Sequence, residues 1–128
     1  MAMQSSKMGA WELDAETGLM NWSAELEDIF GLEPGTFPGR LVAFFDLILP
    51  EDRDMVWQEL NAARENHTNY SVEFQFLHAD GSTRWMEGRG EAMYSDAGEP
   101  VRVYGIGIDI TQRRRAEGRP RARTPVSV

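Results

Sequence analysis

The fold is decided by a stretch in the C-terminal half, residues 70–111, which reads YSVEFQFLHADGSTRWMEGRGEAMYSDAGEPVRVYGIGIDIT. Apolar and polar residues alternate from Tyr70 to Phe76, and this period of two predicts a strand with one aromatic face. Asp80-Gly81 is a residue pair that tolerates the positive φ of a hairpin turn, and a second turn is expected at 96–100. The stretch therefore predicts three consecutive antiparallel strands, over residues 70–76, 83–94 and 101–110.

The residues upstream of this stretch predict two short strands and three helices. Ser23 is the type of residue that caps a helix N-terminus, and Gly31 is the type that ends a helix. Pro50 suits the first turn of a further helix, where its missing N–H has no partner to lose. The expected elements are strands over residues 9–14 and 19–22 and helices over residues 24–31, 41–49 and 50–66. This order predicts an α+β fold, with helices on one face of an antiparallel sheet.

Length and composition favour one domain and exclude several kinds of chemistry. The chain has 128 residues, and 13 basic against 21 acidic side chains give a net charge of −8. No cysteine is present, which excludes disulfides, thiol nucleophiles and cofactors attached through sulfur. The longest apolar stretch, Leu41 to Pro50, is far shorter than the roughly 20 residues of a membrane span. Met1 to Met8 lacks the apolar core of a secretory signal, so we expect a cytoplasmic protein.

Short motifs run in a fixed order through most of the chain. They are Trp11-x-x-Asp14, Gly18, Trp22-Ser23, Pro50-Glu51-Asp52-Arg53, Glu73-Phe74, Asp80-Gly81-Ser82-x-Arg84-Trp85, Gly98 and Gly105-x-x-x-Asp109-Ile110-Thr111. Together they resemble a PAS domain of the subgroup common in bacterial sensor histidine kinases and cyclic-di-GMP signalling proteins. The resemblance covers about residues 9–117. It implies a five-stranded antiparallel sheet in the order 2-1-5-4-3 with short helices on one face, and a sensory or interaction module rather than a catalyst.

The resemblance also implies that a ligand pocket would lie between the helices and the sheet. The residues expected to line it are Phe30, Phe44, Phe45, Val56, Leu60, Phe74, Phe76, Met86, Gly88, Gly105 and Gly107. The glycines would either leave room for a planar ligand or let the helices pack closely on the strands, and the sequence leaves both readings open. A non-covalently bound flavin stays possible, because it needs no nucleophile. Haem and Cys-linked chromophores are not expected, since cysteine is absent and His67 and His78 are expected on the surface.

The opposite face of the last strand is apolar and predicts an interaction surface. It carries Tyr104, Ile106, Ile108 and Ile110, with Trp85 on the neighbouring strand. A sheet face this apolar needs a cover, so we expect a homodimer in which a second protomer supplies it. A ligand-free homodimerisation or docking module is accordingly the alternative function.

The residues Asp109-Ile110-Thr111 resemble the junction through which PAS sensors pass a structural shift into an output helix. The same residues fit an ordinary helix cap equally well. If the junction acts in signalling, the partner is an effector domain or protein, and a small-molecule ligand supplies the signal.

The chain ends in a basic segment. Residues 1–111 hold 7 basic and 20 acidic side chains, a net charge of −13, whereas residues 112–128 hold six arginines and Glu117, a net charge of +5. We expect a leader over residues 1–8, a domain over 9–111, and the start of an output helix with a flexible tail over 112–128. Gly118 and Pro120 are expected to end that helix after about two turns. Nucleic-acid binding is not expected, because no aromatic residue follows Tyr104 to stack on bases.

Independent catalysis and a metal site are not expected either. No serine has a convincing histidine partner in the sequence. Glu87, Arg89 and Glu91 alternate on one strand face, which is typical of mutually paired surface charges. Gly105-x-Gly107 is too short for a dinucleotide-binding loop and lies within a strand.

Overall fold

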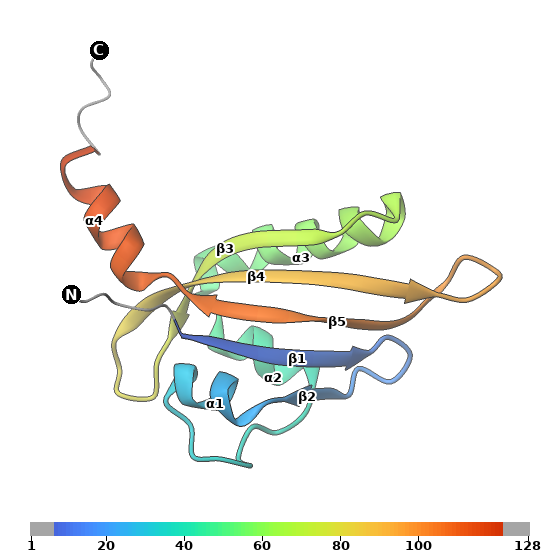
Figure 1. Cartoon of the computed structure of the whole chain (residues 1–128), viewed down its shortest axis with the longest axis horizontal. Coiled ribbons are helices and arrows are strands. Elements are labelled where there is room, and N and C mark those ends of the chain that lie inside the picture. Colours follow the sequence, from blue (N-terminus) through green and yellow to red (C-terminus); the bar gives the residue numbers. More distant parts are fainter. Residues whose placement is uncertain (1–6, 122–128) are drawn as a thin grey trace.

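The computed structural model describes residues 7–121, in which helices cover one face of a five-stranded antiparallel sheet (Figure 1). The elements are β1 (Met8–Asp14), β2 (Met20–Trp22), α1 (Ala24–Phe30), α2 (Leu41–Leu47), α3 (Pro50–Asn66), β3 (Tyr70–Leu77), β4 (Thr83–Tyr94), β5 (Pro100–Asp109) and α4 (Thr111–Arg121). The strands lie side by side in the order β2-β1-β5-β4-β3. The predicted α+β class and strand order are both confirmed.

The central strand β5 decides how the sheet is built. It pairs with β1 on one side and with β4 on the other. On the β4 side, Gly90 lies opposite Gly105 and Gly88 lies opposite Gly107. Two glycine pairs therefore stand at the middle of the sheet, on the strands that the helices cover.

The helix ends follow the expected chemistry in two cases and differ in a third. The Ser23 side chain accepts a hydrogen bond from the backbone N–H of Leu26, and α1 ends at Gly31 with φ +81°. However, α2 ends at Leu47 rather than at residue 49, as we had expected. The reason is that the Leu49 N–H donates to the carbonyl of Gln75 at 3.0 Å, which ties the chain to the edge strand β3.

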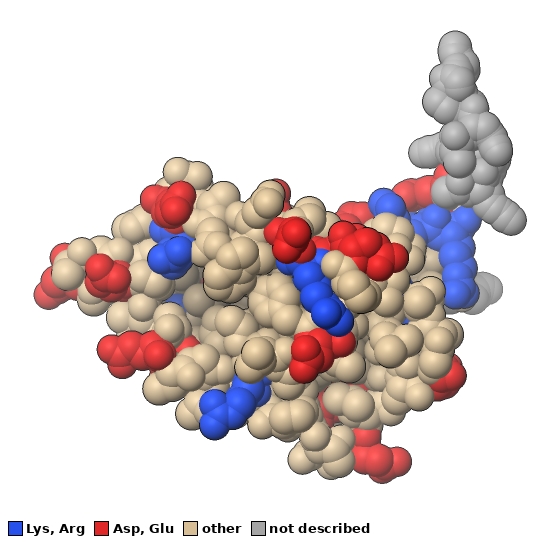
Figure 2. Space-filling view, turned by 180° about the vertical axis from the view of Figure 1, so that it is seen from behind, with Lys and Arg blue, Asp and Glu red and all other residues tan. Residues whose placement is uncertain are grey.

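The core lies between the helices and the inner face of the sheet. The largest side chains that are almost completely buried are Ile29, Phe30, Ile48, Val56, Phe74 and Phe76. Aromatic rings from separate elements pack together there; the Phe30 and Phe76 rings, for example, are 4.5 Å apart between centroids. Figure 2 shows the helix-covered side from outside, with acidic side chains spread over it and a hollow at the end opposite α4.

The last helix, α4, leaves the sheet where β5 ends (Figure 1). It runs from Thr111 to Arg121, so the expectation that Gly118 and Pro120 would end it after two turns is wrong. The helix continues through Pro120, whose missing N–H removes a single intrahelical hydrogen bond. Residues 1–6 and 122–128, which include most of the expected leader and the end of the basic tail, lie outside the described residues. No helix within residues 7–121 is long and apolar enough to cross a membrane.

Candidate functional site

A small cavity lies between the helices and the sheet, where the sequence predicted a ligand pocket. Its volume is about 30 Å³, room for about two water molecules. The residues from the predicted set that line it are Phe30, Phe44, Leu60, Phe74, Met86, Gly88 and Gly107. The interior is therefore almost filled by the chain's own side chains.

Three other residues of the predicted set do not line this cavity. Val56 and Phe76 have no exposed surface and belong to the packed core, closer to α3 and the end of β3. Phe45 is partly buried and packs edge-on against Trp57, with ring centroids 5.9 Å apart. These side chains support the wall of the cavity rather than form it.

Gly105, also expected in the pocket, does not line the cavity but allows two strands to pack closely. It lies beside a shallow groove on the outer face of the sheet instead of in the cavity. A Cβ atom at Gly105 would overlap the backbone carbonyl of Arg89, so only glycine fits there. The indole ring of Trp11 covers the neighbouring Gly90. A Cβ at Gly90 would therefore come within 2.8 Å of that ring. Close packing therefore accounts for this glycine pair.

A much larger cleft opens next to the interior cavity, between the end of α3 and the far ends of β4 and β5. Its volume is about 760 Å³, within the range of about 300–1,000 Å³ that small-molecule sites occupy. Leu13, Leu41, Leu60 and Tyr70 line both the cleft and the interior cavity. These four side chains form the partition between the two spaces.

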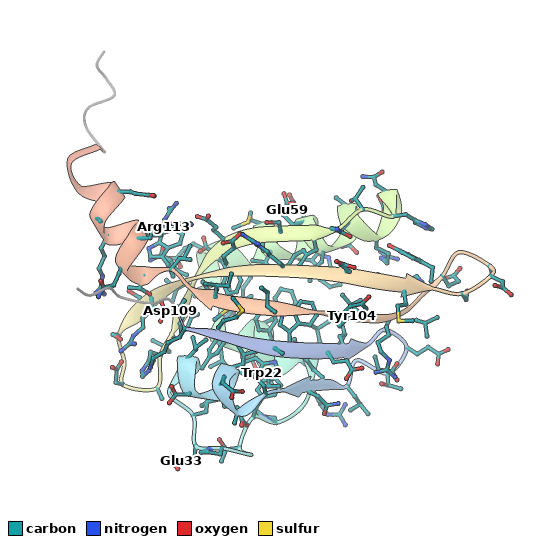
Figure 3. All side chains as sticks on the ribbon, in the orientation of Figure 1. Trp22, Glu33, Glu59, Tyr104, Asp109 and Arg113 are labelled. Carbon is teal, nitrogen blue, oxygen red and sulfur yellow. The ribbon has the colours of Figure 1, made fainter. Side chains whose placement is uncertain are left out.

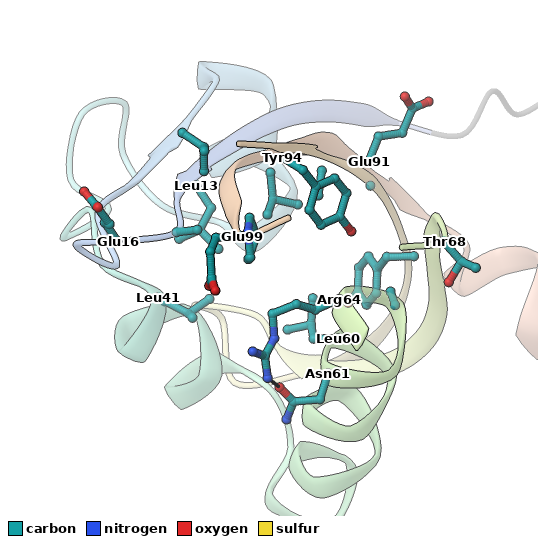
Figure 4. A pocket seen from close by; sticks show the side chains of 18 of the residues that line it. Leu13, Glu16, Leu41, Leu60, Asn61, Arg64, Thr68, Glu91, Tyr94 and Glu99 are labelled. Atoms are coloured by element: carbon teal, nitrogen blue, oxygen red, sulfur yellow. Dashed lines mark hydrogen bonds between the residues drawn. The ribbon is translucent and has the colours of Figure 1, made fainter. Parts of the chain in front are cut away.

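The wall of the cleft carries charges of both signs (Figure 4). Arg64 comes from α3, and its Nη2 donates a hydrogen bond to Oδ1 of Asn61 at 2.7 Å. Glu16 and Glu99 come from the β1–β2 and β4–β5 turns. Glu91 from β4 also lines the cleft. Among the side chains described for residues 7–117, none forms an ion pair with any of these four charged groups.

Two tyrosines contribute phenol rings to the same cleft. Tyr70 is 6% exposed, and burial raises the pKa of its phenol, with the negative charge of Glu59 adding to the shift. Tyr94 stacks on His67 with ring centroids 4.0 Å apart. The hydroxyl oxygen of Tyr94 is buried and has no hydrogen-bond partner among the described residues. Such an atom is costly to leave unsatisfied.

The outer face of the sheet presents part of the predicted interaction surface. Tyr104 is 42% exposed, while Ile106 and Ile108 are partly exposed beside it. Across the β1 pairing, Met8 lies opposite Ile108 and extends the apolar surface. Ile110, which the sequence also placed on this face, is instead buried, because the chain turns inward there before α4 begins.

The predicted signal junction is held by a compact set of hydrogen bonds where β5 meets α4. The Asp109 carboxylate accepts from the Thr111 backbone N–H at 2.9 Å, so Asp109 caps the helix. The Thr111 hydroxyl turns away from the helix and accepts from the backbone N–H of Trp85 at 2.9 Å. The Ile110 N–H donates to the Trp85 carbonyl at 3.0 Å. The backbone of Trp85 on β4 thus forms the hydrogen bonds that hold both Ile110 and Thr111 at this junction.

The first turn of α4 also makes side-chain contacts with the sheet, which the sequence did not predict. Glu73 on β3 accepts from Arg113 at 2.7 Å and from Arg114 at 3.2 Å. The Arg114 guanidinium lies over the Trp85 ring, so Trp85 is covered by this chain's own helix. Figure 3 shows Arg113 and Asp109 at this end of the sheet, away from the cleft. Two arginines of the basic segment are therefore engaged with the domain itself.

The two histidines differ in their surroundings. His67 is exposed, as expected, and ends α3 with φ +52°. His78 is less exposed than expected, since only 15% of its side-chain surface is accessible. A Cβ at Gly31 would overlap the His78 ring, so the absence of a side chain at Gly31 makes room for it. Within residues 7–121, no group of three or more His, Asp or Glu side chains is placed to hold a metal ion.

Comparisons with known proteins give the chain a family. The sequence model of the family described as PAS fold matches residues 19–107. The chain is 34% identical to a blue-light-activated histidine kinase of Brucella ovis over 115 residues, which is 90% of this chain and 22% of that kinase. It therefore spans about a fifth of the length of that relative.

Solved structures give the same result. A sensory box histidine kinase/response regulator from Burkholderia thailandensis superposes with a TM-score of 0.81 and 34% identity, covering 91% of this chain and 86% of that one. The N-terminal domain of a diguanylate cyclase with a PAS/PAC sensor, from Marinobacter aquaeolei, has a TM-score of 0.75 at 20% identity, covering 84% and 98%. The second likeness concerns the fold alone.

Proposed function

Because the chain belongs to the PAS-fold family, we propose that it is a cytoplasmic, non-catalytic sensory domain that binds a small molecule non-covalently in the open cleft. Its relatives are sensor-containing signalling proteins, and a sensory role in signal transduction fits them. The observation that carries the proposal is the cleft of about 760 Å³, which shares a wall with the interior cavity. A ligand in the cleft would press on Leu60 and Tyr70 and so reach the packed core.

A flavin is the cofactor that the blue-light-activated relatives suggest. The interior residues do not fit its ring system as they are packed, because the cavity holds about 30 Å³. The chain also has no cysteine with which a flavin could form an adduct. We therefore place the proposed ligand in the cleft rather than in the interior.

The output of the proposed sensor is the junction between β5 and α4. Strand β4 contributes Gly90, Glu91, Ala92 and Tyr94 to the cleft at one end and Trp85 to the junction at the other. A shift of β4 along or across its neighbours would therefore change the hydrogen bonds that hold Thr111. The partner that reads this change is an effector domain or protein, of the histidine kinase or cyclic-dinucleotide class.

A homodimerisation or docking module is the second candidate, and the exposed apolar face around Tyr104, Ile106 and Ile108 favours it. The Arg114 side chain of α4 covers Trp85. A second protomer would therefore contact β5 and β1 rather than Trp85. The two candidates are compatible, because the cleft and this face lie on opposite sides of the sheet.

The sensory proposal is tested by identifying what the purified chain carries. An absorption spectrum is recorded first, and the small molecules released on denaturation are then identified by mass spectrometry. A defined small molecule retained by the folded chain supports the proposal, and an absorption spectrum with flavin bands would assign it to that cofactor. A colourless chain that releases nothing counts against a ligand sensor and leaves the dimerisation module as the better account.

A further inference from the structure

We propose that the open cleft binds a small zwitterion with an apolar body, of the class of hydrophobic α-amino acids and dipeptides made from them. The proposal rests on the sensory function proposed above and names the chemical class of its ligand. Three features of the cleft carry it, namely charges of opposite sign on facing walls, an apolar and aromatic lining between them, and an unsatisfied hydroxyl.

The charges of the cleft are matched to a ligand that carries both signs. Figure 4 shows Arg64 on the α3 wall and Glu16 and Glu99 on the side of the strand turns. Because these side chains form no ion pair with the side chains described for residues 7–117, each has its charge available for a ligand. A guanidinium donates in a fork that fits a carboxylate, and carboxylates accept from an ammonium group. Asn61 holds the Arg64 fork in place through its 2.7 Å hydrogen bond.

A ligand with only one sign of charge fits this arrangement less well. An amine would leave Arg64 without a partner and close to the positive ligand. A simple carboxylate would leave Glu16 and Glu99 facing a negative ligand across a partly enclosed space. Because Arg64, Glu16 and Glu99 are exposed, water and salt weaken these repulsions, so the arrangement disfavours both single-charge ligands by a small factor. A zwitterion pairs its carboxylate with Arg64 and its ammonium group with the glutamates of the strand turns, while Glu91 points away from them (Figure 4).

The body of the ligand is defined by the surface between the charged groups. Leu60, Val103 and the ring of Tyr70 line it, and Trp57 stands at the rim with half of its surface exposed. Contact with these groups removes apolar ligand surface from water. The volume of about 760 Å³ admits a single hydrophobic amino acid or a dipeptide.

The hydroxyl of Tyr94 supplies a third polar contact. Its oxygen is buried and unpartnered among the described residues, while its ring is held against His67. A free amide or carboxylate oxygen on the ligand can accept from this hydroxyl, which would otherwise remain unsatisfied. Because the oxygen is buried, a ligand atom reaches it only when the Tyr94 ring or a neighbouring side chain moves.

The test is to titrate small molecules into the chain and to monitor binding by the NMR shifts of the backbone amides. The zwitterions are L-phenylalanine, L-leucine, L-methionine and the dipeptide leucyl-phenylalanine. The matched single-charge compounds are phenethylamine, which lacks the carboxylate of phenylalanine, and 3-phenylpropanoate, which lacks its ammonium. We expect at least one zwitterion to shift cleft residues, with both single-charge compounds weaker by about two- to fivefold, the effect of losing one solvent-exposed ion pair.

Variants of the charged side chains assign each contact. Arg64→Gln should weaken binding of the zwitterion to the level of its carboxylate-free analogue, and the double variant Glu16→Gln/Glu99→Gln to the level of its ammonium-free analogue. Arg115→Gln is the matched control, because Arg115 is exposed on α4 and outside the cleft. The proposal is overturned if none of the zwitterions binds, or if a zwitterion and its single-charge analogues bind equally.

Failure of this proposal is distinguishable from failure of the sensory function. If the folded chain retains a small molecule that is not a zwitterion and the panel does not bind, the ligand class is wrong and the sensor stands. If the chain retains nothing and no compound shifts the cleft residues, both proposals fail together.

Discussion

The guanidinium of Arg114 lies over the ring of Trp85, 3.8 Å from the ring centroid, and also donates to Glu73. The first turn of α4 is thereby tied to β4 and β3 at once. These contacts add to the backbone attachment that Thr111 and Ile110 make to Trp85. The expected output helix thus rests on two strands whose relative position a ligand in the cleft could alter.

Glu73→Gln should loosen α4 without unfolding the domain. The change removes the charge that binds Arg113 and Arg114, and because all three side chains are more than a third exposed, we expect a loss of unfolding free energy of at most about 1 kcal/mol. Hydrogen exchange of the α4 backbone amides should become up to about fivefold faster. Glu65→Gln, on the exposed side of α3, is the control. Equal exchange in the two variants would show that Glu73 does not hold the helix.

Gly105→Ala and Gly88→Ala should differ sharply in stability. A Cβ at Gly105 would overlap the Arg89 carbonyl, whereas a Cβ at Gly88 would sit at an ordinary 3.5 Å from Phe74 and Tyr70. In chemical denaturation we expect Gly105→Ala to lose at least about 2 kcal/mol, in the range of overpacking. Gly88→Ala should change stability by less than about 1 kcal/mol, since alanine suits a strand better than glycine does. Similar losses of unfolding free energy in both variants would contradict the view that close strand packing requires glycine at 105 but not at 88.

Glu27→Gln should weaken the chain at neutral pH and lessen its sensitivity to acid. The Glu27 carboxylate accepts from the backbone N–H groups of Gly35 at 2.8 Å and Phe37 at 3.0 Å, and these bonds lower its pKa below the ordinary 4.5. A lowered folded-state pKa stabilises the fold above the unfolded value, and this stability is lost as the pH falls through the folded value.

Denaturation at pH 7 should therefore show a loss of about 1–3 kcal/mol for Glu27→Gln. The difference from the native chain should shrink as the pH falls below 4.5. Glu33→Gln, exposed on the same loop, should stay within about 0.5 kcal/mol of the native chain at pH 7. A Glu27→Gln loss that stayed constant down to pH 2 would contradict the role assigned to the charge.

Ile108→Arg should convert a dimer to a monomer in sedimentation equilibrium. Ile108 lies on the apolar outer face, opposite exposed Met8 and on the same face as Tyr104, so an arginine there would place a charge within the proposed interface. Val42→Arg, at an exposed position on α2, should leave the mass unchanged. An unaltered mass for Ile108→Arg would remove this face as the dimer interface.

The strand pattern could be predicted because side chains alternate along β3, and the family motifs supplied the strand order. The end of α2 could not be predicted, because it depends on a hydrogen bond between Leu49 and the distant Gln75. The burial of His78 likewise depends on the gap left by Gly31, which lies 47 positions away in the chain. Local patterns do not contain such long-range contacts.

The candidate site shows the same division. Seven of the eleven residues expected in the pocket line the interior cavity, and the expectation came from the family resemblance, which implies the strand face that points toward the helices. The sequence did not indicate the larger cleft, which is assembled from the end of α3 and from turns whose residues look like ordinary surface residues. Arg64 and Glu99 carry no sequence signal, because only the folded chain brings them to one opening.

The central claim, that a small molecule occupies the cleft, is tested most directly by blocking the cleft. Ala92 lines it from β4, and Ala92→Trp would fill it, while Ala62→Trp places the same side chain on the exposed side of α3. The molar amount of small molecule released on denaturation is measured by mass spectrometry for the native chain and both folded variants. The account predicts a defined molecule from the native chain and from Ala62→Trp and none from Ala92→Trp. Release of the same amount from all three, or from none, would contradict it.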